Sequence, residues 1–352
     1  MIHVIKNKTV LTCNPTTTQM PLKRWLVTGG CGFIGANLIR VLLERGLAAG
    51  VRIVDDLTVG RITTIEDFAR VELLSAPRPI AEGPVEIVQS SIASDVVRWI
   101  GNADVVVHLA ANTGVQPSIN SPRADLERNV LGTFNMLEAA RLAGASNFVF
   151  ASSGAVAGNV EPPIHEDMVC RPLSPYGASK LAGEGYCSAY YWSYGLRTVS
   201  LRFSNVYGPW STHKGSVVAQ FIRQALDREN WVLNGDGAQT RDFIFVEDLI
   251  AAIIAAAGFE GGGEVFQIAT EHETSVRQLA DLLKFEIERE FGISPTIEFG
   301  PPVRGDVRKN FASIAKARRL LGWAPKWQLE DGIAATVRWF GERYLPSSRR
   351  GG

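Results

Sequence analysis

A short apolar strand that runs directly into a glycine-rich turn constrains this chain more than any other feature. Trp25 to Val27 is followed by Thr28 and the run GGCGFIG at 29–35, and Phe33 to Leu43 then has helical spacing. Glycine permits a tight turn and lets a pyrophosphate approach the backbone, while the helix N-terminus offers free N–H groups. The segment therefore predicts the strand, phosphate loop and helix of a dinucleotide-binding fold.

An acidic residue stands where such a fold binds the adenosine ribose. Asp55 follows the second predicted strand, Val51 to Val54, and lies 20 residues after Gly35. A carboxylate there accepts hydrogen bonds from the ribose hydroxyls and repels a 2′-phosphate, so the pattern favours NAD over NADP as the cofactor. The alternative is a tight structural turn with Asp55 as an ordinary loop acid.

Strands and helices alternate up to about residue 204. The strands are short, rich in β-branched residues and apolar on both faces, as in a parallel sheet that helices cover on both sides. Further strands are predicted at 85–88, 104–107, 147–150 and 197–201, and helices at 126–142, 175–194 and 329–344. We therefore expect an α/β fold, with a Rossmann-type doubly wound parallel sheet and a smaller mixed α/β C-terminal substrate domain.

A chain of 352 residues suits about two domains. Glycine, proline and scattered charge increase after residue 205, where the alternation weakens. The expected division is an N-terminal extension at 1–24, an NAD-binding domain at 25–204 to which 235–270 returns, a substrate-binding domain at 205–234 and 271–345, and a tail at 346–352.

A tyrosine and a lysine share one face of the helix predicted at 175–194. Tyr176 and Lys180 are four residues apart, which places them one above the other. A free tyrosine has a pKa of about 10 and is a poor base at neutral pH. A nearby ammonium and an oxidised nicotinamide would both favour the phenolate, so Tyr176 is a candidate general base. The alternative is a surface helix that carries an incidental tyrosine.

Two serines end the strand predicted at 147–150. Ser152 and Ser153 follow it directly, and ligands bind at that edge of a doubly wound sheet. A serine there can form a hydrogen bond with the same substrate oxygen as Tyr176, and Ser153 is the favoured candidate. The alternative is a residue that caps a turn or helix.

The overall charge and the cysteines narrow the classes of partner and location. Lysine plus arginine (36) equals aspartate plus glutamate (36), so no nucleic-acid partner is expected. The four cysteines lack CxxC spacing and the five histidines are scattered, which predicts reduced thiols and no metal site. The first twenty residues lack the apolar core of a signal peptide, and the longest apolar run, 249–259, is too short to span a bilayer. A cytoplasmic protein with no membrane partner is expected.

Taken in order, these segments resemble the extended short-chain dehydrogenase/reductase family. The resemblance rests on TGGCGFIG at 28–35, Asp55, HLAA at 108–111, NVLGTFNMLEAAR at 129–141, the Ser-Ser strand end and YGASK at 176–180. Later segments are similar to its NAD-dependent nucleotide-sugar epimerase and dehydratase branch: LRFSNVYGP at 201–209, GDGAQTRDFIFVEDL at 235–249 and LGWAPKW at 321–327. The match covers about residues 24–345.

The resemblance implies a division of labour among the residues. Catalysis falls to Ser153, Tyr176 and Lys180. The implied NAD-binding residues are Gly29, Gly32, Phe33, Ile34, Gly35, Asp55, Asp56, Ser91, Ile92, Leu109, Ala110, Ala111, Asn129, Tyr176 and Lys180. The implied ligands of a nucleotide-diphosphate sugar are Ser153, Asn205, Val218, Arg241, Arg304 and Asp306. A homodimer through helices at about 124–142 and 176–195 is also implied.

Arg241 suits a pyrophosphate because its planar fork of N–H donors matches phosphate oxygens. The alternative for Arg241 is an ion pair with the neighbouring Asp242.

The residues after Ser153 bear on the reaction. In the dehydratase branch an Asp-Glu pair follows the strand-end serine or threonine, and in the decarboxylase branch a glutamate follows. Here Gly154 and Ala155 follow, and neither can exchange a proton. We therefore expect 4-epimerisation, in which Tyr176 takes the 4-hydroxyl proton, hydride leaves C4 for NAD, the 4-keto sugar turns, and hydride returns to its other face.

The candidate substrates of such a reaction are UDP-glucose or UDP-galactose, a UDP-N-acetylhexosamine and a UDP-hexuronic acid. A dehydratase or reductase of the same family is the alternative enzyme. A non-catalytic NAD-binding regulator is the alternative of another class, which the Ser153, Tyr176 and Lys180 set disfavours. A nucleic-acid-bound dinucleotide sensor is disfavoured by the neutral charge.

Overall fold

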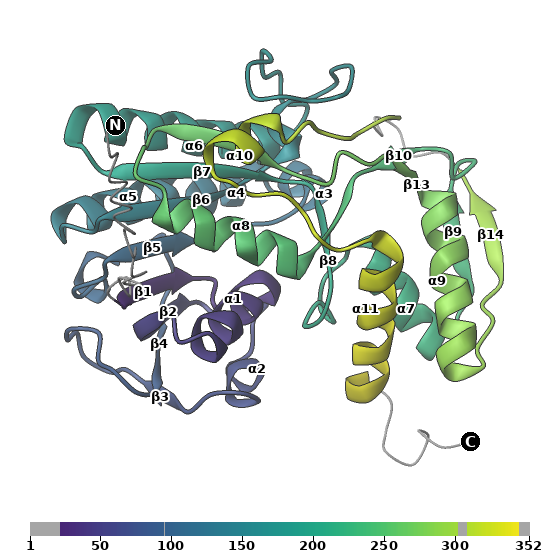
Figure 1. Cartoon of the computed structure of the whole chain (residues 1–352), viewed down its shortest axis with the longest axis horizontal. Helices are drawn as coiled ribbons and strands as arrows, with labels where there is room; N and C mark the ends of the chain where they lie inside the picture. Colours follow the sequence, from purple (N-terminus) through teal and green to yellow (C-terminus); the bar gives the residue numbers. More distant parts are fainter. Residues whose placement is uncertain (1–21, 95, 302–307, 345–352) are drawn as a thin grey trace, which may run out of the picture.

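Eight parallel strands form the main sheet of the computed structural model, which describes residues 22–94, 96–301 and 308–344 (Figure 1). In spatial order they are β12 (Glu264–Ile268), β7 (Arg197–Phe203), β6 (Asn147–Ser153), β5 (Val105–His108), β1 (Lys23–Thr28), β2 (Ala48–Asp55), β4 (Val85–Gln89) and β3 (Val71–Leu73). The order reverses between β5 and β1. The carboxyl ends of these two strands therefore open the crevice where a doubly wound sheet binds its ligand.

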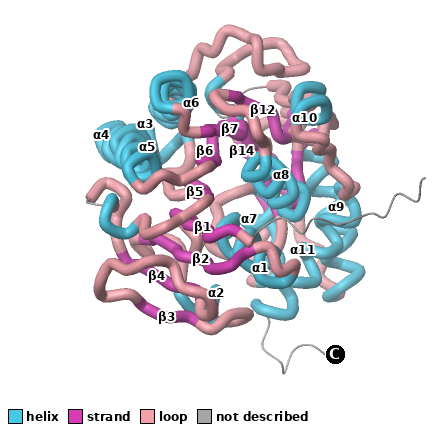
Figure 2. Tube along the Cα trace, turned by 60° about the vertical axis from the view of Figure 1, so that its left-hand side comes forward, coloured by secondary structure: helices cyan, strands magenta, loops and turns pink. Residues whose placement is uncertain are grey.

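Alternate residues of each central strand supply two separate cores. Trp25 and Val27 of β1 belong to the core under α1 (Phe33–Glu44) and α8 (Val246–Gly258), whereas Leu26 belongs to the core under α5 (Gly132–Leu142) and α6 (Pro175–Tyr194). The strand period of two explains this division. Figure 2 shows the two helical layers on opposite faces of the sheet.

The predicted α/β fold with a doubly wound parallel sheet is confirmed. Helices predicted at 175–194 and 329–344 coincide with α6 and with α11 (Leu329–Tyr344). β3, a three-residue edge strand whose central residue is Glu72, was not predicted from the sequence. The helix predicted at 126–142 is divided into a π-helical turn, η2 (Leu126–Leu131), and α5.

Shorter helical segments join these elements in the larger lobe. They are α2 (Ile62–Glu66), η1 (Val97–Trp99), α3 (Val115–Asn120), α4 (Pro122–Asp125), η3 (Gly154–Val156) and α10 (Ala315–Leu320).

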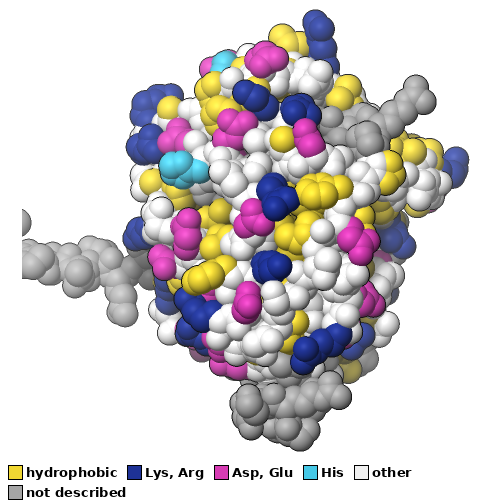
Figure 3. Space-filling model, turned by 90° about the vertical axis from the view of Figure 1, so that its right-hand side faces the viewer, with side chains coloured by type: hydrophobic (Ala, Val, Ile, Leu, Met, Phe, Trp, Pro, Cys, Tyr) yellow, Lys and Arg dark blue, Asp and Glu magenta, His cyan; other side chains and the backbone are white. Residues whose placement is uncertain are grey.

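A smaller lobe holds a third core between helices. Its helices are α7 (Val217–Leu226), α9 (Val276–Phe291) and α11, and its parallel strand pair is β9 (Trp231–Asn234) with β14 (Ile297–Gly300). Trp231 is fully buried and stacks on Phe221 with 4.7 Å between the ring centroids. Basic, acidic and apolar side chains are intermingled on the face of this lobe that Figure 3 shows.

Two small strand pairs join the lobes. β8 (Asn205–Tyr207) lies parallel to β11 (Phe243–Phe245), and β10 (Thr240–Arg241) lies antiparallel to β13 (Thr274–Ser275). The chain then returns to the larger lobe, where α8 packs on α1 and β12 pairs with β7. Asn205 is thereby placed two residues past Phe203, the strand partner of Ser153.

Candidate active site

The glycine-rich loop leaves an open cradle at the start of α1. A Cβ on Gly35 would lie 2.5 Å from Gly30 Cα and 2.6 Å from the Gly29 carbonyl oxygen, so only glycine fits there. Gly29 has φ of +67° and packs against the backbone of Ala110 after β5. Gly32 is the N-cap of α1 and makes no side-chain cap bond, which leaves the first-turn N–H groups, those of Phe33 and Ile34 included, for a ligand. These features fit a dinucleotide pyrophosphate.

Asp55 lies at the mouth of this loop, at the end of β2. Its buried carboxylate accepts hydrogen bonds from Cys31 N at 3.0 Å and Leu57 N at 2.9 Å. Burial raises the pKa of this carboxyl, and the two backbone N–H groups lower it. A carboxylate has about four lone-pair sites, so two of them stay available for ribose hydroxyls. The next residue, Asp56, accepts hydrogen bonds from Thr58.

A buried histidine ties the loop after β5 to the glycine loop. His108 contacts Thr28 Oγ1 through Nδ1 at 2.8 Å and Thr133 Oγ1 through Nε2 at 3.1 Å. Because the Thr133 hydroxyl donates to the Asn129 carbonyl, it accepts from Nε2–H, which assigns the proton to that nitrogen. Burial lowers the pKa of His108 to about 3. The neutral ring thus fixes the Leu109–Ala111 turn beside Gly29.

Tyr176 and Ser153 meet at the carboxyl end of β6. Ser174 caps α6 by accepting from Gly177 N at 3.1 Å, and Pro175 occupies the first turn, so the helix begins one residue before Tyr176. The Ser153 side chain lies beside the Tyr176 hydroxyl and interacts with it. Burial raises the pKa of the Tyr176 phenol, and the interaction with Ser153 lowers it.

Lys180 lies one helical turn further, between α6 and the sheet. Its Nζ donates to the Ala151 carbonyl at 2.8 Å and lies 5.9 Å from the centre of the Tyr176 ring. Burial lowers the pKa of this ammonium to about 8, while Asp125 is the largest of the groups that oppose the shift. The predicted trio of Ser153, Tyr176 and Lys180 is therefore brought together at the ligand-binding edge of the sheet.

A neighbouring ion pair escaped the sequence analysis. Glu184 lies one turn after Lys180 and accepts from Ser152 Oγ at 2.5 Å. Arg202 on β7 donates to both Glu184 oxygens, at 2.9 and 2.7 Å, and all three residues are buried. The network clamps the strand end that carries Ser153 against α6. The spacing of Tyr176, Lys180 and Glu184, four residues each, is the signal that would have found it.

Asn129 forms hydrogen bonds with the protein itself. Its side chain joins the backbone of Asn112 to Asp125 and Ser179, at 2.7 to 3.1 Å. Ser91 and Ile92 follow β4, on the far side of β2 from the glycine loop. The Ile92 carbonyl accepts from Asn135 of α5, which anchors this turn.

A cavity of about 400 Å³ opens between β8, α7 and β9. Asn205, Val218 and Arg241 all line it. The Arg241 guanidinium donates to the Thr240 carbonyl, while the buried Asp242 carboxylate accepts from Thr270, Glu271 N and Ala312 N. Arg304 and Asp306, the other two predicted substrate ligands, lie outside the described residues.

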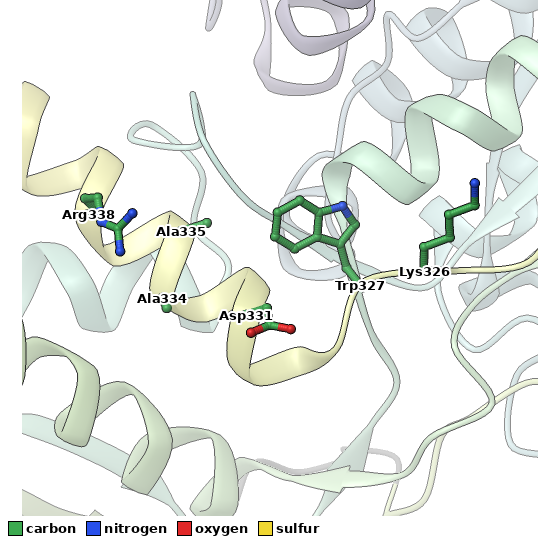
Figure 4. Close-up of a pocket in the computed structure, with 6 residues that line it drawn as sticks. All are labelled: Lys326, Trp327, Asp331, Ala334, Ala335 and Arg338. Carbon is green, nitrogen blue, oxygen red and sulfur yellow. The ribbon is translucent and has the colours of Figure 1, made fainter.

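A second hollow lies apart from this site. It is lined by Lys326 and Trp327, which precede α11, and by residues of α11, among them Arg338 (Figure 4). Within the described ranges, no group of three or more histidine, cysteine or acidic side chains could hold a metal ion. Nor does any helix of the described chain combine the length and apolarity that crossing a membrane requires.

The comparisons with known proteins agree with this geometry. Residues 25–269 match the model of the NAD dependent epimerase/dehydratase family. The chain belongs to this family. It is 37% identical over 324 residues to a UDP-glucose 4-epimerase of Mycolicibacterium smegmatis, covering 90% of this chain and 98% of that one. It is 32% identical over 323 residues to a UDP-glucuronate 4-epimerase of Thermodesulfobacterium geofontis, covering 90% and 95%.

A solved member of the family shares the whole architecture. The UDP-glucose 4-epimerase of Thermotoga maritima, solved with UDP-glucose, superposes with a TM-score of 0.81 at 33% identity and covers 92% of this chain and 100% of that one. Family membership confirms NAD as the cofactor and the expectation of a nucleotide-sugar epimerase. The glycine cradle and Asp55 are the features of this chain that fit NAD.

Proposed function

We propose that this family member is a 4-epimerase of UDP-linked sugars in which Ser153, Tyr176 and Lys180 are the catalytic residues. The observation that carries the proposal is the position of the Tyr176 hydroxyl beside Ser153 at the carboxyl end of β6, with Lys180 Nζ 5.9 Å from the centre of the tyrosine ring. The named epimerases among the relatives support the substrate class.

Tyr176 is the proposed base for the sugar 4-hydroxyl. Held by the glycine loop and Asp55, NAD would supply the hydride chemistry at C4 of the sugar. Burial alone would keep the Tyr176 phenol protonated, because burial disfavours the charged phenolate. The Lys180 ammonium offsets this cost by its positive charge, and Ser153 donates a hydrogen bond to the oxygen that carries the charge.

The remaining predicted residues are proposed to hold the two ligands. Glycines 29, 32 and 35 with the start of α1 bind the NAD pyrophosphate, and Asp55 binds the ribose. The other NAD contacts are proposed at Asp56, Ser91, Ile92 and Leu109 to Ala111. Asn129 supports the site by holding the Asn112 backbone. Asn205 and Val218 contact the substrate, and Arg241 binds its diphosphate.

The residues after Ser153 favour epimerisation over loss of water. Gly154 and Ala155 form the short η3 turn at the strand end, and Ala155 N donates to Ser153 Oγ at 3.2 Å. Expulsion of a 6-hydroxyl needs an acid that can protonate the leaving group, and this turn supplies none.

Product analysis tests the reaction. Purified protein is incubated with NAD and, separately, UDP-glucose, UDP-N-acetylglucosamine and UDP-glucuronic acid, and products are resolved by chromatography and mass. We expect a product of unchanged mass and new retention time from at least one sugar. Loss of water or carbon dioxide without any 4-epimer would contradict the proposal.

A homodimer through α5 and α6 is a further part of the proposal. Phe134 of α5 makes edge contacts with Tyr186 and Tyr190 of α6, and Tyr190 contacts Tyr194. Phe134, Tyr186 and Tyr194 are nevertheless 38%, 42% and 58% exposed. A second copy that lays the same two helices across this face would bury it, as a two-fold interface requires.

Negative charge introduced at this face is expected to dissociate the dimer. The double substitution Phe134→Glu and Tyr186→Glu should raise the dimer dissociation constant by about 100-fold or more, because carboxylates would be buried unpaired. Light scattering with size-exclusion chromatography measures the change. Phe299→Glu, which alters an exposed aromatic of β14, is the control and should stay dimeric. A wild type that is monomeric at high concentration would end this proposal.

Two further proposals concern the domain boundaries and the cellular location. We propose that 25–204 with 235–270 is the NAD-binding unit, and that 205–234 with 271–345 is the substrate-binding unit, except that α10 packs on the core of the NAD-binding unit. We also propose a cytoplasmic location, since the described cysteines Cys31, Cys170 and Cys187 are all free thiols.

A further inference from the structure

The substrate cavity contains a cation for which the proposed reaction has no use. Lys214 lies in the loop between β8 and α7 and lines the cavity together with Asn205. Its Nζ donates to the Val206 carbonyl at 3.2 Å and lies 5.0 Å from the centre of the Phe33 ring. The ammonium is therefore held between the substrate strand β8 and the first residue of the NAD helix.

The loop that carries Lys214 is held from both lobes. Arg223 of α7 donates to the carbonyls of Thr212 at 2.6 Å and Lys214 at 2.9 Å. Asn37 of α1 donates to the Pro209 carbonyl at 3.0 Å at the other end of the loop. The position of the ammonium is thus set by the fold before a ligand arrives, as a recognition group requires.

Lys214 has no negative partner among the residues that the structure describes. Across the described ranges no carboxylate forms an ion pair with it, and one of its three N–H donors is used. Burial lowers the pKa of the ammonium to about 8, and no acidic group opposes that shift. A half-buried cation without a counter-ion among the described residues carries a desolvation cost, and an anion from the ligand would lower that cost.

The two cations that line the cavity come from different parts of the chain. Arg241 lies on β10 and is the proposed ligand of the diphosphate. Lys214 packs against Phe33, the first residue of the NAD helix. With the diphosphate assigned to Arg241, a neutral hexose offers no further negative charge to Lys214, whereas a hexuronate offers a carboxylate.

We propose that the Lys214 ammonium binds the carboxylate of a hexuronate and makes this chain selective for a UDP-hexuronic acid over the corresponding neutral UDP-hexose. This inference rests on the proposed 4-epimerase function. It assigns Lys214 as a specificity-determining residue and leaves the proton transfer to Tyr176.

The test compares two substrates in matched variants. For wild type, Lys214→Met and Lys214→Arg, kcat/KM is measured with UDP-glucuronic acid and with UDP-glucose. We expect wild type to prefer the uronate. The preference, taken as the ratio of the two values, should fall roughly 10- to 100-fold in Lys214→Met, since a charge-assisted hydrogen bond is lost, and recover partly in Lys214→Arg. Lys326→Met, which removes an ammonium from the hollow in Figure 4, should leave the ratio as in wild type.

The possible results distinguish a failure of this inference from a failure of the proposed epimerase function. Equal losses on both sugars would assign Lys214 to the diphosphate and overturn the inference, as would an unchanged ratio. A wild type that epimerises UDP-glucose but prefers it to the uronate would also overturn it while leaving the epimerase proposal intact. A wild type that epimerises neither sugar nor any other would defeat the proposed function itself.

Discussion

Tyr176→Phe is expected to lower kcat for epimerisation roughly 10²- to 10⁴-fold, which is the range that a positioned general base contributes. The substitution removes the hydroxyl that lies beside Ser153 and leaves the ring in place. NAD should still bind, because the glycine cradle and Asp55 are untouched. Single-turnover rates and NAD content per subunit measure the two effects separately.

The control for this variant is a tyrosine on the same helix. Tyr191→Phe removes a hydroxyl of α6 four turns beyond the site, where Tyr191 packs against Trp192. It should keep kcat within about 3-fold of wild type, a difference below 1 kcal/mol. If Tyr176→Phe behaved like Tyr191→Phe, Tyr176 would not be the base and the alternative of a non-catalytic NAD-binding protein would return.

Gly35→Ala is expected to disable the cofactor site. The new Cβ would lie 2.5 to 2.7 Å from three backbone atoms of Gly29 and Gly30, and backbone cannot move aside as a flexible side chain can. Overpacking of this kind costs about 1–3 kcal/mol, so the NAD dissociation constant should rise roughly 10- to 100-fold. Titration with NAD and chemical denaturation report the binding and the free energy of unfolding.

A second glycine tests whether the effect is local. Gly258 ends α8, is exposed, and a Cβ there would meet nothing within 4 Å. Gly258→Ala should therefore bind NAD as wild type does. Circular dichroism of Gly35→Ala shows whether the chain is still folded when NAD binding is lost. If folded Gly35→Ala bound NAD with wild-type affinity, the glycine loop would not be the NAD-binding site.

Elements that follow from local pattern could be predicted from the sequence. The glycine run, the i, i+4 pair of Tyr176 and Lys180, and the apolar strands all have short-range causes. The edge strand β3 was missed because Glu72 interrupts its apolar residues, and because it has three residues and depends on pairing with the next strand, β4. Its existence depends on the neighbouring strand and not on its own three residues.

The parts of the site that were missed depend on tertiary contacts. Lys214 stands in a loop of polar residues and glycine, which in sequence is typical of a solvated surface. It is half-buried because α1 and β8, two elements that are far apart along the chain, both contact it. The Glu184 and Arg202 pair likewise joins a helix to a strand.

The most direct test of the central claim follows the hydrogen on C4. UDP-glucuronic acid and UDP-glucose, each deuterated at C4, are incubated with the NAD-loaded protein in ordinary water, and the 4-epimer is analysed by mass and NMR. If Tyr176 moves only the hydroxyl proton and NAD returns the hydride that it took, the deuterium stays on C4 of the inverted product. A 4-epimer that has lost its deuterium to solvent would contradict the account, because the hydrogen on C4 would then have left as a proton.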